Sequence, residues 1–457
     1  MKRILVALLV CVGALVPAHA AHADRPATVQ VEGRWFVDAG GRVVGMRGVN
    51  FVQKFPPVSP ESVGFGDDDA AFLAAHGFNV VRLGVVFGAV MPQPGRIDNA
   101  YVQSIAHTTD VLARHGIETL LDFHQDGYGP AVHGNGFPEW ATLTDGLPNP
   151  NVDFPLYYIL NPALERAFDN FWLNRNGPDG VPLQTNYAKA VRSVAAAVAD
   201  QPSVLGYDIM NEPWPGTDWN ACLTGCPDLE RARLLPFEQR MTDAVRSVDK
   251  RHPVFAEPWV LFNFGMTDTV VPNPGDALSF HVYATAPSDE PAVVAHALAA
   301  ANARNVPPLA TEYGATTDPA TIDRIATTIE DGLVPWIFWS YDENLVIDKS
   351  KPPTSTNVRA DVLAALDRPY AAATNGTPKS WHYDTAAGDV QFSYSTTRAD
   401  GKRGHPNDDT EIVVPFGYRA TVSGARVVSA PCASTLQLRN DLFATQVSVH
   451  IVKAACA

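Results

Sequence analysis

Eight short apolar segments of strand length recur between residues 43 and 339, and stretches with helical spacing separate several of them. Strands that alternate with helices form a parallel sheet with the helices packed outside it. Eight such units predict an α/β fold, a (β/α)8 TIM barrel with long insertions. A doubly wound open sheet is the weaker alternative, because no glycine-rich phosphate loop follows any of the segments. The expected strands are residues 43–49, 79–83, 119–124, 205–212, 253–256, 277–281, 308–312 and 335–339, and the clearest helical stretches are residues 72–76, 97–115 and 186–200.

The pattern of the sequence changes after residue 366. Residues 371–378 are small and polar residues with a Gly and a Pro, and they predict a linker. Beyond it, residues 390–395, 426–428 and 447–452 have the alternation or clustering typical of strands. These observations predict a small C-terminal antiparallel β-sandwich. The expected division of the chain is a signal peptide at residues 1–23, the barrel at residues 24–370 and the sandwich at residues 371–457.

The N-terminus has the layout of a secretory signal peptide. Lys2 and Arg3 precede an apolar run from residue 4 to residue 16, and small residues follow at Ala20 and Ala23. Such a segment is removed after a small residue, so we expect cleavage after Ala20 or Ala23 and a secreted protein. The run is too short for a transmembrane anchor, which takes about 20 apolar residues.

Acidic side chains outnumber basic ones, and the formal net charge is −15. A chain with this charge repels the phosphate backbone of nucleic acids and an anionic membrane surface. We therefore expect no nucleic-acid partner.

Four cysteines follow the expected signal peptide, and in an exported protein they favour disulfides. Proximity in the sequence pairs Cys222 with Cys226 and Cys432 with Cys456. The alternative, that Cys222 and Cys226 are half of a zinc site, lacks a second pair of ligands nearby. A disulfide that tightens one loop is the preferred interpretation of the first pair.

Two of the expected strands end in glutamate. Glu212 closes residues 205–212 and is followed by Pro213, and Glu312 closes residues 308–312. The carboxyl ends of barrel strands form the mouth where chemistry is done, and the fourth and seventh strands lie on opposite walls. Retaining glycosidases use two carboxyl groups about 5–5.5 Å apart, one as acid/base and one as nucleophile. The pair predicts glycoside hydrolysis that needs no cofactor and no metal.

Several neighbours of the two glutamates fit this chemistry. Asn211 can donate to a sugar 2-hydroxyl, a contact that strengthens in an oxocarbenium-like transition state. Arg82 and Tyr283 can contact Glu312 and help to keep it ionised. Three further side chains at strand ends can orient hydroxyl groups or Glu212, or offer a flat face to a sugar ring: His124, His281 and Trp339.

These residues in this order resemble glycoside hydrolase family 5. The stretch at residues 208–216, with those at residues 122–126, 136–141 and 161–172, is similar to the endoglycoceramidase branch rather than to the cellulases. The resemblance runs from about Val43 to Tyr341, and the family also carries a C-terminal β-sandwich. It implies that Glu212 is the acid/base and Glu312 the nucleophile, and that Lys54 and Asp126 are additional sugar contacts.

The resemblance implies a retaining hydrolase that cleaves the β-glycosidic bond between a glycan and ceramide. Its substrate would be a glycolipid presented in micelles or membranes, and we expect a monomer. One alternative is a family 5 glycosidase on another β-linked substrate, such as a β-glucan or a steryl glucoside. Another is a glycolipid-binding barrel without catalysis, which carboxylates more than about 7 Å apart would favour.

Residues 127–172 form a long insertion after the third expected strand, and they are dense in aromatic side chains. Because loops that follow barrel strands lie at the mouth, we expect this insertion to lie over it. Two interpretations stay open: the aromatic residues line an apolar wall for the lipid part of a substrate, or they form a small core of their own.

Overall fold

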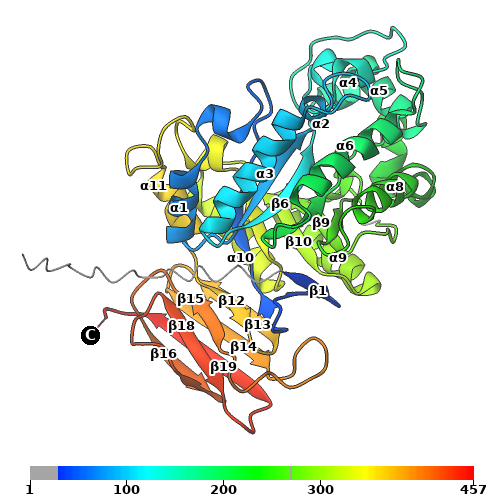
Figure 1. Ribbon diagram of the computed structural model, residues 1–457. Coiled ribbons are helices and arrows are strands. Elements are labelled where there is room, and N and C mark those ends of the chain that lie inside the picture. Colours follow the sequence, from blue (N-terminus) through cyan, green and yellow to red (C-terminus); the bar gives the residue numbers. More distant parts are fainter. Residues whose placement is uncertain (1–28, 268–269, 457) are drawn as a thin grey trace, which may run out of the picture.

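The computed structural model describes residues 29–267 and 270–456, and it contains a barrel and a β-sandwich (Figure 1). Eight parallel strands close the barrel in the order β10-β11-β4-β5-β6-β7-β8-β9. The predicted TIM barrel is confirmed, whereas the predicted signal peptide lies outside the described residues. The barrel strands are β4 (Arg47–Phe51), β5 (Val80–Val86), β6 (Glu118–His124), β7 (Val204–Asp208), β8 (Val254–Ala256), β9 (Ala277–Val282), β10 (Pro308–Tyr313) and β11 (Trp336–Phe338).

Helices surround the barrel, and several begin at a side chain that caps the first turn. Asp98 accepts hydrogen bonds from the N–H groups of Ala100 and Tyr101, and Asn161 caps the next long helix in the same way. None of the described helices is long and apolar enough to cross a membrane. They are α1 (Asp67–Ala75), α2 (Phe87–Val90), α3 (Asn99–Arg114), α4 (Tyr157–Leu160), α5 (Pro162–Trp172), α6 (Leu183–Val198), α7 (Pro227–Leu229), α8 (Leu235–Arg246), α9 (Glu290–Arg304), α10 (Pro319–Asp331) and α11 (Ala360–Leu366).

The barrel strands are buried on both faces, so they are apolar along their length rather than alternating with polar residues. Successive side chains point to opposite sides of a strand. Val80 and Leu120 accordingly belong to one apolar cluster, while their neighbours Val81 and Leu121 belong to another, larger cluster that includes residues of the helices. This packing fixes which residues at the strand ends face the mouth.

The C-terminal region forms two antiparallel sheets, as predicted. One sheet has the order β1-β2-β3-β12-β15-β18-β17 and the other β13-β14-β19-β16. The first contains β1 (Gln30–Glu32), β2 (Trp35–Val37), β3 (Val43–Val44), β12 (Tyr370–Thr374), β15 (Thr410–Val413), β18 (Thr435–Asn440) and β17 (Ala425–Val427). The second contains β13 (Thr377–Asp384), β14 (Asp389–Ser395), β19 (Gln446–Lys453) and β16 (Tyr418–Ser423).

Two details of the sequence analysis were wrong. The expected first strand, residues 43–49, is two strands, because Val43 and Val44 pair with β12 of the sandwich and only the part from Arg47 onward joins the barrel. The expected linker, residues 371–378, lies mostly within β12 and β13. The first error arises because the partner strand of Val43 and Val44 lies more than 300 residues away, and local composition does not reveal it. The second arises because small and polar residues, which are typical of a linker, here pair with β3, β14 and β15. The division of the chain at residue 371 stays a prediction, and β1, β2 and β3 belong to a sheet of the sandwich.

Both expected cysteine pairs are joined. The Cys222–Cys226 disulfide lies at the end of the loop after β7, with its Cα atoms 4.6 Å apart. The Cys432–Cys456 disulfide ties the connection between β17 and β18 to the chain that follows β19. Since the sulfur atoms of Cys222 and Cys226 are bonded to each other, these residues do not offer half of a zinc site.

Candidate active site

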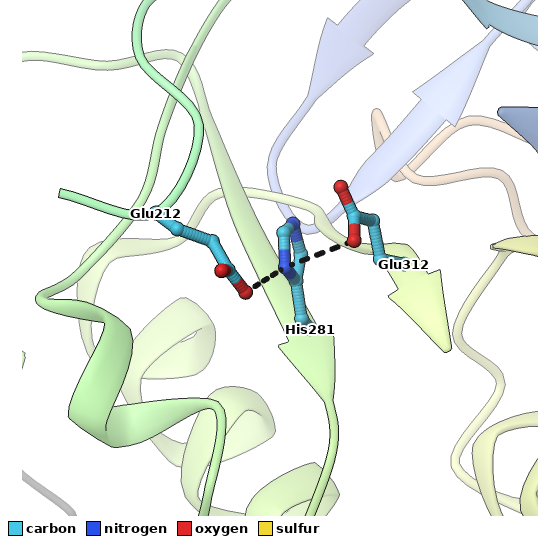
Figure 2. A group of neighbouring side chains, drawn as sticks. All are labelled: Glu212, His281 and Glu312. Atoms are coloured by element: carbon cyan, nitrogen blue, oxygen red, sulfur yellow. Dashed lines mark hydrogen bonds and ion pairs between the residues drawn. The ribbon is translucent and has the colours of Figure 1, made fainter. Parts of the chain in front are cut away.

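Glu212 and Glu312 face each other across the mouth of the barrel. Figure 2 shows both side chains reaching toward His281, which lies between them. One carboxylate oxygen of each glutamate and a ring nitrogen of His281 all lie within 4.8 Å of one another. Both glutamates are buried, with 6 % and 4 % of their surface exposed. The short separation is compatible with the carboxyl spacing of retaining glycosidases, about 5–5.5 Å, and lies below the 7 Å that would favour a non-catalytic barrel.

Glu212 is held in an unusual backbone conformation. It lies four residues beyond the end of β7, and its φ is +44°, in the left-handed region that costs a residue with a side chain roughly 1 kcal/mol or more. Its N–H donates to Glu257 Oε2 at 3.1 Å, and Gln125 Nε2 donates to its carbonyl at 2.9 Å. These two buried bonds fix the direction in which the carboxylate points.

His281 connects the two glutamates. Its Nδ1 lies 2.7 Å from Glu212 Oε1 and 3.5 Å from Glu312 Oε2, and its Nε2 lies 3.2 Å from Glu257 Oε1. Burial alone would lower the pKa of His281, but the surrounding carboxylates outweigh burial and raise this pKa well above its ordinary value. This direction favours the charged imidazole, whose Nδ1 faces both glutamates.

Arg82 is a fully buried guanidinium beneath Glu312. The four carboxylates around it outweigh the effect of burial and raise the pKa of Arg82 well above its ordinary value. Its Nη2 also donates to Asn211 Oδ1 at 2.9 Å, and Asn211 Nδ2 donates one N–H to the Gln125 carbonyl at 3.0 Å, which leaves its second N–H to donate. The carboxylates around Arg82 are Glu312 at 2.6 Å, Asp122 at 3.0 Å, Asp208 at 3.0 Å and Glu257 at 3.2 Å.

The surroundings of Glu312 shift its pKa in opposite directions. Burial raises the pKa of Glu312 to about 7, although the positive charges of His281 and Arg82 pull it down. The hydroxyl of Tyr283 donates to Glu312 Oε2 at 3.0 Å, and Arg82 Nη1 occupies the other oxygen. The structure therefore brings both expected partners to Glu312, one at each oxygen.

The expected sugar contacts form a second group beside the pair. Lys54 Nζ lies 3.0 Å from Asp126 Oδ2 and 4.4 Å from the centre of the Trp339 ring. His124 stacks on the same ring at 5.4 Å and places its Nε2 3.2 Å from Asp126 Oδ2. Glu343 completes the group by accepting from Trp339 Nε1 at 2.9 Å. This arrangement offers charged and aromatic surfaces to hydroxyl groups and a sugar ring.

Three residues around the pair received no role from the sequence: Asp208, Glu257 and Gln125. Asp208 is an isolated acid inside an apolar strand, which is a signal that could have marked it. Burial outweighs Arg82 and holds the pKa of Asp208 well above its ordinary value. Glu257 and Gln125 each follow a strand, and no other feature of the local sequence marks them.

Among the described residues, Glu212, His281 and Glu312 form a group whose possible ligand atoms lie close enough together to hold a metal ion. Arg82 already lies 2.6 Å from Glu312, and the raised pKa of His281 favours its charged form. A cation placed there would meet two positive groups. The donor set therefore does not fit a metal well, and the absence of a metal requirement stays a prediction.

The insertion at residues 127–172 packs its buried aromatic side chains into the main core of the barrel and also borders the site. Tyr128, Phe137 and Phe168 are buried, and Tyr128 packs against both phenylalanines. The Tyr158 hydroxyl accepts a hydrogen bond from the Gly127 N–H at 2.8 Å, in the loop that carries Asp126, and burial raises the pKa of Tyr157 and of Tyr158. The buried residues of the insertion therefore belong to the core of the barrel rather than to a separate core, and an apolar wall for a lipid stays a prediction.

Comparison with known proteins gives matches along most of the chain. Residues 37–345 match the family described as Cellulase (glycosyl hydrolase family 5), and residues 368–451 match the glycoside hydrolase family 5 C-terminal domain. Endoglycoceramidase I of Rhodococcus hoagii is 33 % identical over 443 residues, which cover 91 % of this chain and 86 % of that protein.

Solved structures of endo-glycoceramidase II from Rhodococcus sp. are similar over 92 % of this chain and 100 % of theirs. Its complex with a five-membered iminocyclitol is 30 % identical, with a TM-score of 0.75. Its lactosyl-enzyme intermediate is 29 % identical, with a TM-score of 0.74.

Proposed function

This chain belongs to glycoside hydrolase family 5, and from that premise we propose that it hydrolyses the β-glycosidic bond between a glycan and ceramide, with Glu212 as acid/base and Glu312 as nucleophile. The observation that carries the proposal is the position of the two carboxylates within 4.8 Å of each other around His281. The similarity to endoglycoceramidases over nine-tenths of the chain supports the ceramide side of the substrate.

In the first step, Glu312 attacks the anomeric carbon of the sugar next to ceramide while Glu212 gives its proton to the oxygen that leaves with ceramide. The bond to ceramide breaks, and a covalent glycosyl-Glu312 forms. Arg82 and Tyr283 hold the two oxygens of Glu312 in place before the attack. Asn211, whose amide Oδ1 is fixed by Arg82, would donate its second N–H to the 2-hydroxyl.

In the second step, Glu212 takes a proton from a water molecule, which attacks the same carbon and frees Glu312. The glycan leaves with the configuration it had in the substrate. The relative that was solved as a lactosyl-enzyme intermediate supports this two-step course. Lys54, His124, Asp126 and Trp339 would bind hydroxyl groups and a ring face of the glycan. Export by cleavage after Ala20 or Ala23 and a monomeric state belong to the same proposal.

The proposal is tested by incubating the protein with glycosylceramides, cellulose oligosaccharides and steryl glucosides and identifying the products by mass. Intact ceramide together with a free glycan is the expected result. Cleavage confined to glucans or to steryl glucosides would refute the ceramide assignment and leave the two-glutamate mechanism intact. Binding of the glycosylceramides without cleavage of any substrate would refute both.

A further inference from the structure

A third glutamate lies buried between the elements that carry Glu212 and His281. Glu257 directly follows β8, and β8 is the barrel strand between β7, which leads to Glu212, and β9, which carries His281. Because neighbouring strands lie about 4.8 Å apart, a side chain at the end of β8 can reach residues on both sides. With 2 % of its surface exposed, Glu257 depends on protein groups rather than on water for its hydrogen bonds.

Three donors converge on the carboxylate of Glu257. The N–H of Glu212 donates to Oε2 at 3.1 Å. Arg82 Nη2 donates to Oε1 at 3.2 Å, and Nε2 of His281 lies 3.2 Å from the same oxygen. A carboxylate accepts at both oxygens, whereas the amide of a glutamine presents N–H groups at one end. An ionised carboxylate therefore faces all three donors, and a glutamine of the same length does not.

The contact with the Glu212 N–H acts on a strained turn. The φ of Glu212 is +44°, and a residue with a side chain keeps such a conformation only where its surroundings hold it. Glu257 binds the N–H of this residue, and the Val260 N–H donates to the carbonyl of Pro213 at 3.0 Å. The segment after β8 thus holds the turn after β7 on both sides of the Glu212 Cα atom.

The contact with His281 acts on the carboxylate of Glu212. Nδ1 of His281 lies 2.7 Å from Glu212 Oε1, while its Nε2 faces Glu257. Burial opposes the charged imidazole, and Glu257 is foremost among the carboxylates that raise the pKa of His281 against it. Glu257 therefore fixes the backbone of Glu212 directly and its side chain through the imidazole.

Glu312 has supports of its own. The Tyr283 hydroxyl donates to Glu312 Oε2 at 3.0 Å, and Arg82 Nη1 lies 2.6 Å from Oε1. Arg82 is also anchored away from Glu257, because its Nε lies 3.0 Å from Asp208 Oδ2. Loss of Glu257 should consequently disturb Glu212 more than Glu312.

We propose that Glu257 is a positioning residue of the acid/base, a role that rests on the proposed function. It holds Glu212 at the angle from which the proton of this carboxyl reaches the leaving oxygen. Glu257 acts through Glu212 and His281 and exchanges no proton with the substrate. Since a displacement of about 1 Å in a reacting group can cost about 10²-fold in rate, a residue that acts through position alone can limit the reaction.

The test compares two synthetic β-glycosides with the same glycan, one with an alkyl leaving group and one with a dinitrophenyl leaving group. The alkyl alcohol needs a proton from the acid/base in order to leave, and the dinitrophenolate does not. For both substrates, kcat/KM reports the transition state of the first bond cleavage. We expect Glu257→Gln to lower kcat/KM about 10²-fold on the alkyl glycoside and less than about fivefold on the dinitrophenyl glycoside.

Tyr283→Phe is the matched control, because it also removes one buried polar group but acts on Glu312. Attack by Glu312 is common to the two glycosides, so this variant should lower kcat/KM by similar factors on both. Equal losses in Glu257→Gln would overturn the proposal, since a merely structural role predicts them. Unchanged kcat/KM on the alkyl glycoside would overturn it as well.

Thermal unfolding and cleavage of the dinitrophenyl glycoside show whether Glu257→Gln is folded. If it is not, Glu257→Asp takes its place, because aspartate keeps the charge and draws both oxygens back by one carbon. The same difference between the two glycosides is expected of this variant, and equal losses would overturn the proposal here too.

Failure of the positioning role and failure of the proposed function give different results. The two glycosides contain no ceramide, so a wrong ceramide assignment leaves the comparison intact. If Glu212→Gln loses kcat/KM equally on both glycosides, Glu212 is not the general acid, and the proposed mechanism and the role of Glu257 are both overturned. If Glu212→Gln shows the difference and Glu257→Gln does not, the mechanism stands and the positioning role alone is overturned.

Discussion

Arg82 Nη1 lies 2.6 Å from Glu312 Oε1, and both side chains are buried. Four carboxylates surround this guanidinium, so its positive charge lowers the pKa of Glu312 less than it would lower that of a single partner. Burial therefore prevails over the attraction and leaves the pKa of Glu312 near 7. The candidate nucleophile is consequently poised to change its charge in the neutral range, where small changes in its contacts alter the reactive fraction.

The pH dependence of kcat/KM should show this directly. Glu312 must be ionised to attack, so activity should fall about tenfold per pH unit below about 7, as Glu312 takes up a proton. Tyr283→Phe removes a donor to the charged form and should move this acidic limb upward by about one unit. Tyr370→Phe, whose hydroxyl bonds instead to the Gly77 carbonyl, should leave the limb in place. An acidic limb at the same pH in Tyr283→Phe as in the wild type would contradict the assignment of this limb to Glu312.

Glu212→Gln should separate binding from bond cleavage. The amide can still accept from His281 but has no proton of suitable acidity to give. We expect kcat on a glycosylceramide to fall by about 10²–10⁴, while the dissociation constant measured by calorimetry changes little. The kcat of Glu212→Gln on a substrate with an acidic leaving group, such as a nitrophenyl glycoside, should fall much less. Equal losses on both substrates would show that Glu212 does not act as the general acid.

A covalent intermediate should form on Glu312. A 2-fluoro glycoside slows the second step more than the first, so the glycosyl-enzyme should accumulate and appear as an added mass. We expect the adduct on the wild type and, with an acidic leaving group, on Glu212→Gln, but not on Glu312→Ala. Peptide mapping that places the sugar on Glu257 or Asp126 would assign the nucleophile to a different carboxylate.

The barrel and the two glutamates could be predicted because they depend on local signals. Each strand is a short apolar run, and Glu212 and Glu312 stand where such runs end. Residues at equivalent ends of parallel strands meet at one mouth, so their proximity follows from the fold class. The sequence analysis also placed Arg82 and Tyr283 next to Glu312, although Arg82 lies inside β5 rather than at its expected end.

The surroundings of Arg82 could not be predicted in the same way. Asp122, Asp208 and Glu257 reach it from three other strands or their ends, and which carboxylate contacts which nitrogen depends on the stagger of the closed barrel. The pairing of Val43 and Val44 with the sandwich depends likewise on a strand far along the chain. Local pattern does not encode contacts of this range.

The Lys54 ammonium links Asp126 to the face of Trp339, so its removal tests whether this group binds the glycan. Lys54→Met keeps most of the apolar stem and removes the charge. If Lys54 contacts the sugar in ground state and transition state alike, KM should rise about tenfold while kcat stays within about twofold. Lys349→Met is the matched control, because Lys349 pairs with Asp342 instead, and it should leave both constants near the wild-type values. A fall in kcat at unchanged KM would instead give Lys54 a role in the transition state alone.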